Sequence, residues 1–135
     1  MKNPRQTAVR WIREAEHTLR VAETISKQPE AYNVVCFLAE QAAQKSLKAV
    51  RYLDGARLVS IHSVSELIKQ VSQNRPEFLP LKPRGAILDQ YYITTRYPDA
   101  VAEPAIPSEL FSQQQAEEAL SIARAIFEQS KSVIG

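Results

Sequence analysis

Apolar residues recur along much of the chain at spacings of three and four, the period of an amphipathic α-helix. The first such stripe predicts a helix that opens with Asn3 as N-cap and Pro4 at the first helical position, and that ends near Lys27. The second predicts a helix from Glu30 to Leu53 with a stop at Asp54-Gly55. Several apolar positions of this second helix are alanine, which permits close approach of a neighbouring helix.

Three further helices follow. Ser63 and Glu66 have the spacing of a capping box and open a shorter helix that ends before Pro76. A fourth helix is predicted over 84–95, with Ala86, Ile87, Leu88, Tyr91 and Tyr92 on its buried side. Three prolines make 97–111 an ordered, non-helical loop. The last helix opens at Ser112, again with capping-box spacing to Gln115.

The pattern predicts an all-α protein, an up-and-down four-helix bundle with one additional short helix. The 135 residues suit a single domain over 1–135, and no internal repeat or linker divides them. With 44% hydrophobic and 24% charged residues, the composition is that of a globular domain. A formal charge of +2 is too balanced to indicate a dedicated nucleic-acid binder, although it leaves room for a local basic stripe.

The chemistry that composition excludes is also informative. Cys36 is the single cysteine, and the two histidines are far apart in the sequence, so no metal-ligand spacing is present and no cofactor is expected. No apolar run approaches the roughly 20 residues of a membrane span, and the amino terminus does not resemble a secretory signal. We therefore expect a cytoplasmic protein with no membrane contact.

Two segments carry residue types that suit a binding site. On the second helix, Lys45, Lys48 and Arg51 advance by three and form a basic arc, either a solvated face or a contact for phosphate or an acidic partner. After the fourth helix, Tyr92, Arg96, Tyr97 and Asp99 surround a helix end that Pro98 enforces. This group is either a structural corner or a site in which tyrosines stack on a base and the guanidinium holds a phosphate.

These segments resemble the HEPN domain (higher eukaryotes and prokaryotes nucleotide-binding). The resemblance covers essentially the whole chain and is carried by three stretches in order: 41–49 (QAAQKSLKA), 62–64 (HSV) and 92–99 (YITTRYPD). Gln44 stands where that stretch commonly has a glutamate, which puts in doubt a role that needs a carboxylate there.

The resemblance implies a helical bundle, often a homodimer, that is frequently encoded beside a minimal nucleotidyltransferase. Such a pair is thought to act as a toxin–antitoxin or nucleotide-handling module, with a nucleotide or RNA as ligand. Carried over by position, the candidate nucleotide- or phosphate-binding residues are Lys45, Lys48, His62, Tyr92, Arg96, Tyr97 and Asp99. We expect the lysine-bearing helix and the tyrosine-rich corner to face one shared hollow.

Two functions are alternatives to a nucleotide-binding module. Many HEPN toxins are metal-independent ribonucleases with an Arg-x(4–6)-His motif, which Arg57 and His62, or Arg10 and His17, match in spacing. Those enzymes carry the motif late in the domain, however, and no histidine follows Arg96 at that spacing. A catalyst is therefore less expected than a binding module. The other alternative is a non-catalytic helical dimerisation protein.

Overall fold

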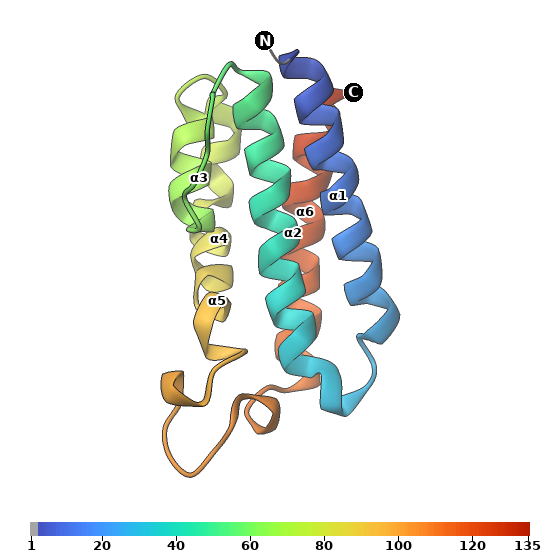
Figure 1. Cartoon of the computed structure of the whole chain (residues 1–135), viewed down its shortest axis with the longest axis vertical. Coiled ribbons are helices and arrows are strands. Elements are labelled where there is room, and N and C mark those ends of the chain that lie inside the picture. The colour runs from blue at the N-terminus through green and yellow to red at the C-terminus, as the bar shows by residue number, and fades with distance from the viewer. Residues whose placement is uncertain (1–2) are drawn as a thin grey trace.

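The computed structural model describes residues 3–135, which form an all-helical bundle without strands in that range. Three long helices lie side by side: α1 (Pro4–Ile25), α2 (Tyr32–Leu53) and α6 (Gln113–Ile134) (Figure 1). The fourth position is taken by α4 (Lys82–Asp89) and α5 (Tyr91–Thr94), which follow one another along the bundle. Since α1, α2, α4–α5 and α6 alternate in direction, the predicted up-and-down four-helix bundle is confirmed.

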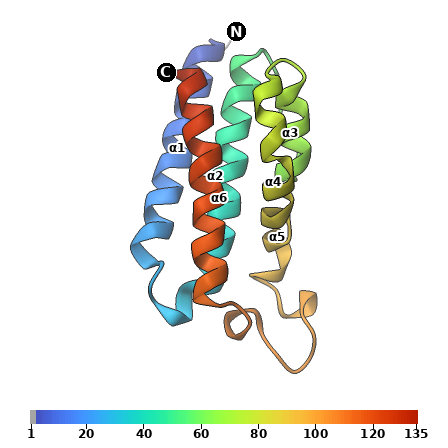
Figure 2. The ribbon, with the colours of Figure 1, turned by 180° about the vertical axis from the view of Figure 1, so that it is seen from behind.

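The additional short helix is α3 (Val64–Ser72). The connector after α2 runs back along the bundle, so that α3 lies beside α4 and away from α1 (Figure 1 and Figure 2). Four short 3-10 segments complete the described chain: Pro29–Ala31, Pro76–Leu81, Pro98–Ala100 and Pro107–Glu109. The last two lie in the loop before α6, which the sequence predicted as non-helical.

The helix starts follow from their capping side chains. Asn3 Oδ1 accepts hydrogen bonds from the backbone N–H groups of Arg5 and Gln6. Ser112 Oγ accepts from the Gln115 N–H at 3.1 Å, while Gln115 Oε1 accepts from the Ser112 N–H at 2.9 Å. These bonds satisfy N–H groups that have no partner within the helix. Gly55 ends α2 with a φ of +102°, a conformation that side chains with a Cβ rarely adopt.

The predicted fourth helix differs from the observed one in two ways. It begins earlier, at Lys82, and it divides at Gln90 into α4 and α5. Ala86, predicted as buried, is exposed, and Gly85 takes the inner position instead. A Cβ on Gly85 would lie 2.6 Å from Ile68 Cδ1, so the absent side chain allows α4 to approach α3 closely.

The core is continuous through the bundle, and alanine dominates the inner face of α2. Ala39, Ala42, Ala43 and Ala49 are fully buried there. Four buried positions of this helix are polar, namely Glu40, Gln44, Ser46 and Lys48, and Glu40 among them is fully buried. The small alanine side chains allow α1 and α6 to pack closely against α2.

Candidate functional site

Arg96 organises the corner at the end of α5. Its Nε and Nη2 donate to the carbonyl oxygen of Tyr92 at 3.0 and 2.5 Å, so the side chain caps the last turn of the short helix. The guanidinium carbon lies 4.4 Å from the ring centroid of Phe37 on α2. The corresponding distances to the rings of Tyr92 and Tyr97 are 5.0 and 4.9 Å, so three aromatic rings surround one cation.

His62 joins the same cluster from the connector before α3. Its ring is stacked on that of Tyr92, with centroids 5.2 Å apart and an interplanar angle of 13°. Four of the predicted site residues, His62, Tyr92, Arg96 and Tyr97, are thus brought together. Because Arg96, Tyr97 and His62 are all exposed, the cluster faces solvent and is accessible to a ligand.

An apolar hollow of about 440 Å³ lies beside this cluster. Its walls come from the start of α2, the end of α5 and the loop before α6, and its lining residues are Asn33, Val34, Phe37, Thr95, Arg96, Pro98, Ile106, Pro107 and Ser108. Asn33 Nδ2 donates to the Thr95 carbonyl at 3.0 Å, while its Oδ1 is buried without a hydrogen-bond partner among the described residues. The hollow therefore offers an apolar surface and one cation, whereas Asn33 Oδ1 lies buried behind its wall.

Asp99 lies in the 3-10 turn Pro98–Ala100 and is exposed. Within residues 3–135 no salt bridge joins Asp99 to Arg96, although the two residues are close in sequence. Arg96 is held instead by the Tyr92 carbonyl and the aromatic rings.

The lysines of α2 point the other way, toward α1. Lys45 Nζ donates to Thr18 Oγ1 at 2.9 Å and lies 3.8 Å from Glu14 Oε2. Lys45 lines a separate open cleft of about 810 Å³, together with Thr7, Arg10, Trp11, Arg13, Glu14 and His17 of α1. The expectation of one shared hollow is therefore wrong: Lys45 lines this cleft and Arg96 lines the other.

Lys48 is buried, with its Nζ 5.8 Å from the ring centroid of Trp11. Burial lowers the pKa of this amine, since the charged form is penalised away from water, while nearby Glu40 opposes the shift. Periodicity alone placed Lys48 on a basic arc, but the packing of α1 against α2 covers it. Its position suits a structural role at the α1–α2 contact.

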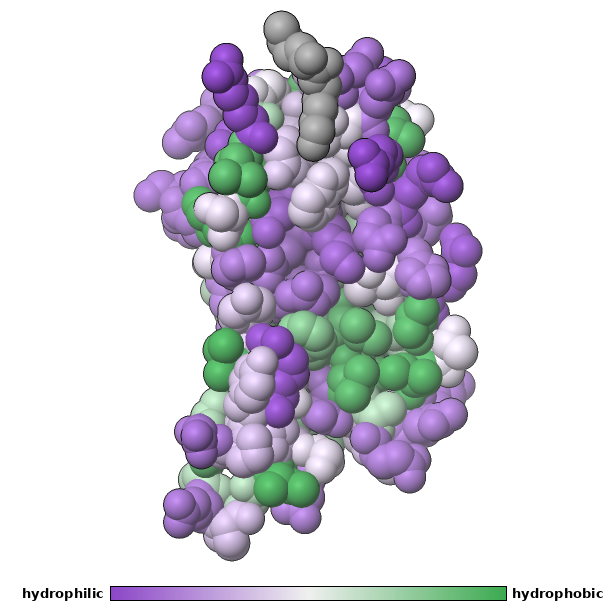
Figure 3. Space-filling model, viewed as in Figure 1, coloured by the Kyte–Doolittle hydropathy of each residue, from purple (hydrophilic) through white to green (hydrophobic). Residues whose placement is uncertain are grey.

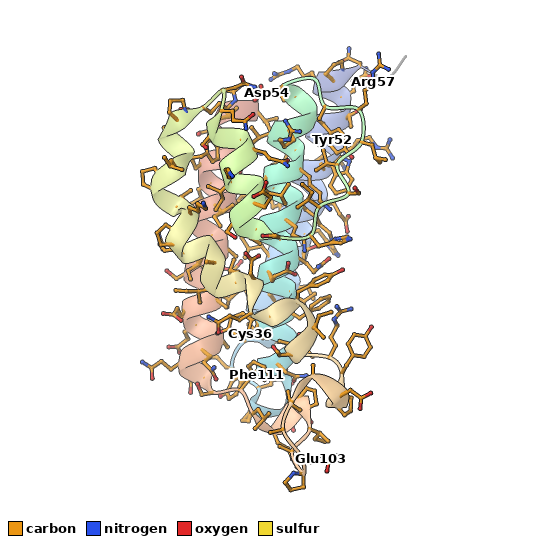
Figure 4. All side chains as sticks on the ribbon, turned by 90° about the vertical axis from the view of Figure 1, so that its left-hand side faces the viewer. Cys36, Tyr52, Asp54, Arg57, Glu103 and Phe111 are labelled. Atoms are coloured by element: carbon orange, nitrogen blue, oxygen red, sulfur yellow. The ribbon has the colours of Figure 1, made fainter. Side chains whose placement is uncertain are left out.

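Arg57 and His62 do not form a local pair. The segment between them has no helical turn, and both side chains are exposed. Arg57 lies at the end of the bundle, near Tyr52 and Asp54, whereas Glu103 marks the opposite end, in the loop that follows α5 (Figure 4). The His62 ring is instead stacked on that of Tyr92 in α5.

Glu40 lies in this region, but the sequence offered no reason to choose it as a candidate functional residue. Its carboxyl accepts hydrogen bonds from Gln41 Nε2, at 2.9 Å, and from Gln44 Nε2. Burial raises the pKa of Glu40 to about 7, although the two amide hydrogen bonds and the charge of Arg96 act in the opposite direction. Gln44, at the position where a glutamate is common in related stretches, thus serves as a donor to this carboxyl.

Two other kinds of site find no support in residues 3–135. No group of three or more His, Cys, Asp and Glu side chains in that range could hold a metal ion. None of the helices in the same range combines the length and the apolar character needed to cross a membrane.

The chain is similar in sequence and in structure to known proteins. The family model for the HEPN domain matches residues 8–133. A crystal structure of TT1696 from Thermus thermophilus is 32% identical, with a TM-score of 0.83, over 93% of this chain and 96% of that one. ST0689, described as an archaeal HEPN homologue, is 30% identical with a TM-score of 0.76 over the full length of both chains. No curated protein matches the chain.

Proposed function

Because the chain belongs to the HEPN domain family, we propose that it is a binding module that takes a nucleotide in the hollow beside Arg96. The single observation that supports this most strongly is the arrangement around that residue. An exposed guanidinium is enclosed by three aromatic rings at the edge of an apolar hollow.

The base and the phosphate of a nucleotide would occupy different parts of the proposed site. A nucleobase is flat and largely apolar on its faces, so it suits the hollow between Phe37 and Pro107. The phosphate would lie at the exposed rim. There Arg96 Nη1 has only a long contact of 3.5 Å, to Tyr97 Oη, and remains available as a donor.

Calorimetric titration with AMP and GMP, each of which carries a base and a single phosphate, tests this proposal. We expect saturable binding to the wild type and at least a tenfold loss with Arg96→Ala. Arg84→Ala is the matched control, because Arg84 is an exposed arginine of α4 outside both hollows. No heat with any nucleotide, or an equal loss in the two variants, would exclude the site.

A second part of the proposal concerns a protein partner, and we call it the companion role. We propose that the domain acts with a minimal nucleotidyltransferase in a two-component, toxin–antitoxin-like module, and the family likeness supports this. Exposed Tyr97 is a candidate acceptor for a transferred nucleotide. Co-purification with the product of a neighbouring nucleotidyltransferase gene, followed by intact-mass measurement, would reveal a complex or an added nucleotide. Absence of both would remove the companion role and leave the binding site untouched.

Self-association is proposed through the adjoining surfaces of α1 and α2. Val21 of α1 is 39% exposed, and Figure 3 shows apolar side chains gathered over the lower parts of these two helices. A patch of this kind often marks a protein interface. Light scattering should give a homodimer mass for the wild type and a monomer mass for Val21→Glu.

The ribonuclease alternative that uses Arg57 and His62 has less support from the geometry. These two residues would have to act on one phosphodiester, yet Arg57 lies at the end of the bundle near Asp54, whereas His62 is stacked on Tyr92 of α5. Expression of the wild type and of His62→Ala, with RNA integrity as readout, tests this directly. Cleavage that His62→Ala abolishes would establish the alternative instead.

A further inference from the structure

The cleft between α1 and α2 gathers cationic side chains that the nucleotide site does not use. Arg10, Arg13 and His17 follow one another on α1 at spacings of three and four, which places them on one face of the helix. Lys45 of α2 enters the same cleft from the opposite wall. Figure 3 shows strongly hydrophilic side chains over this part of the molecule, above the apolar patch.

The two arginines of the cleft, Arg10 and Arg13, have no salt-bridge partner among the described residues. Within residues 3–135, the salt bridges join Arg20 to Glu16, Lys45 to Glu14, Arg75 to Asp54 and Arg124 to Glu23. Neither Arg10 nor Arg13 takes part in any of them. Arg20, on the same helix, is paired with Glu16, whereas Arg10 and Arg13 carry charge that an anion would compensate.

Glu14 offsets only part of that charge. Among the described residues it is the one carboxylate that lines the cleft, and it lies 3.8 Å from Lys45 Nζ. Lys45 also donates to Thr18 Oγ1, which fixes the amine at the wall. The two arginines and the lysine against one carboxylate leave the cleft with a net positive charge.

The shape of the cleft indicates an extended ligand rather than a single ion. His17 follows Arg10 by seven positions, which is about 10 Å along the axis of an α-helix. A second hollow, lined by Arg5, Gln6, Val9 and Arg10, continues from Arg10 toward the amino terminus. Charges spaced along such a track match successive phosphates, whereas one small anion would contact only one or two of them.

We propose that the α1–α2 cleft is a phosphate-chain site, which binds consecutive phosphate groups through Arg10, Arg13 and Lys45. The same chemistry is present in inorganic tripolyphosphate, in a nucleoside triphosphate and in the backbone of single-stranded RNA. The site is separate from the hollow beside Arg96 and does not depend on the nucleotide proposal.

Inorganic tripolyphosphate is the first probe, with affinity measured by calorimetry. The intrinsic fluorescence of Trp11 gives the location, because Trp11 is the single tryptophan and lines the cleft. We expect binding with a change in Trp11 emission and at least a tenfold loss with R10Q/R13Q. The control R84Q/K131Q removes the same charge from exposed positions outside the cleft, and its affinity should stay within about twofold of the wild type.

Comparison of ATP and a twelve-nucleotide RNA with tripolyphosphate identifies the source of the phosphates. If ATP, the RNA and tripolyphosphate bind with equal affinity, the ligand is a short phosphate chain. If the RNA binds much more tightly and its affinity falls steeply with salt, the ligand is a nucleic-acid backbone. The proposal is overturned if tripolyphosphate does not bind, if both double variants lose affinity equally, or if an oligoglutamate of equal charge binds as tightly. Arg96→Ala should leave tripolyphosphate binding unchanged, so failure here is distinguishable from failure of the nucleotide site.

Discussion

The guanidinium carbon of Arg96 lies 4.4 Å from the ring centroid of Phe37, which joins the corner after α5 to the first turns of α2. Asn33, one turn before Phe37, also reaches this corner through its bond to the Thr95 carbonyl. The hollow beside Arg96 is therefore built on two elements that packing holds together, and α2 supplies its floor.

Phe37→Leu should weaken nucleotide binding while the fold is retained. Leucine keeps an apolar group against α5, but it removes the ring that faces the guanidinium and the base. We expect a three- to tenfold loss in affinity by calorimetry, with the unfolding free energy lowered by about 1 kcal/mol or less. Leu58→Ala, at an exposed position away from the hollow, should have no effect on affinity. Unchanged binding by Phe37→Leu would mean that the ring does not contact the ligand.

Asp89 should contribute strongly to stability. Its carboxylate accepts from the Val64 and Ser65 N–H groups at 2.5 and 3.2 Å and from the hydroxyls of Ser63 and Ser65, so it caps the start of α3 from α4. Asp89→Ala should lower the unfolding free energy by about 2 kcal/mol, because charged acceptors at a helix start are lost.

Urea denaturation at pH 7 measures this change. Asp99→Ala provides the comparison, since Asp99 is exposed and should shift stability by less than about 0.5 kcal/mol. Equal effects of the two substitutions would show that the Asp89 cap has no special weight.

Glu40 should make stability fall as pH rises. Its pKa is raised from the ordinary 4.5 to about 7 in the folded protein, so between these values the folded state binds more protons than the unfolded state. The stabilisation is fully present below pH 4.5 and is lost as pH rises to about 7, by roughly 3 kcal/mol.

Glu40→Gln should remove this dependence, because an amide of the same shape carries no charge. Relative to the wild type, the variant should gain stability from pH 5 to pH 8 in urea denaturation. A constant difference between the two proteins across that range would contradict a raised pKa.

Cys36 should be unreactive in the native state. It is fully buried, and burial raises the pKa of its thiol to about 12, with the charge of Glu118 acting in the same direction. The thiolate is the reactive form, so labelling by Ellman's reagent at pH 8 should be negligible until urea unfolds the chain. Rapid labelling without urea would indicate that the region around the start of α2 and α6 opens readily.

Local signals made the fold predictable. Asn3, Ser63 and Ser112 cap the helices that they were predicted to open, and Gly55 follows α2 as expected. The division of α4 from α5 at Gln90 was not visible, because both halves continue the same apolar pattern. The burial of Gly85 depends on the proximity of α3, which periodicity does not reveal.

The candidate site was predictable only in part. The aromatic corner is local in sequence, so Tyr92, Arg96 and Tyr97 could be recognised together. The sequence could not show which hollow Lys45 lines, since the direction of its side chain depends on where α1 packs. The spacing of Arg10 and His17 indicates that both lie on one face of α1. The sequence does not show that Lys45 of α2 lines the same cleft, because that depends on tertiary packing. Nothing in the sequence indicates that Glu40 is buried.

The most direct test of the central claim is a nuclear magnetic resonance titration of the labelled protein with ATP and with AMP. AMP has a base but a single phosphate, so it separates the hollow beside Arg96 from the phosphate-chain cleft. With AMP, the largest shifts should fall on the amide signals of Asn33, Phe37, Arg96 and Ser108 and on the Arg96 Nε–H. Saturating AMP that shifts none of these signals, or that shifts only those of α1, would contradict the account.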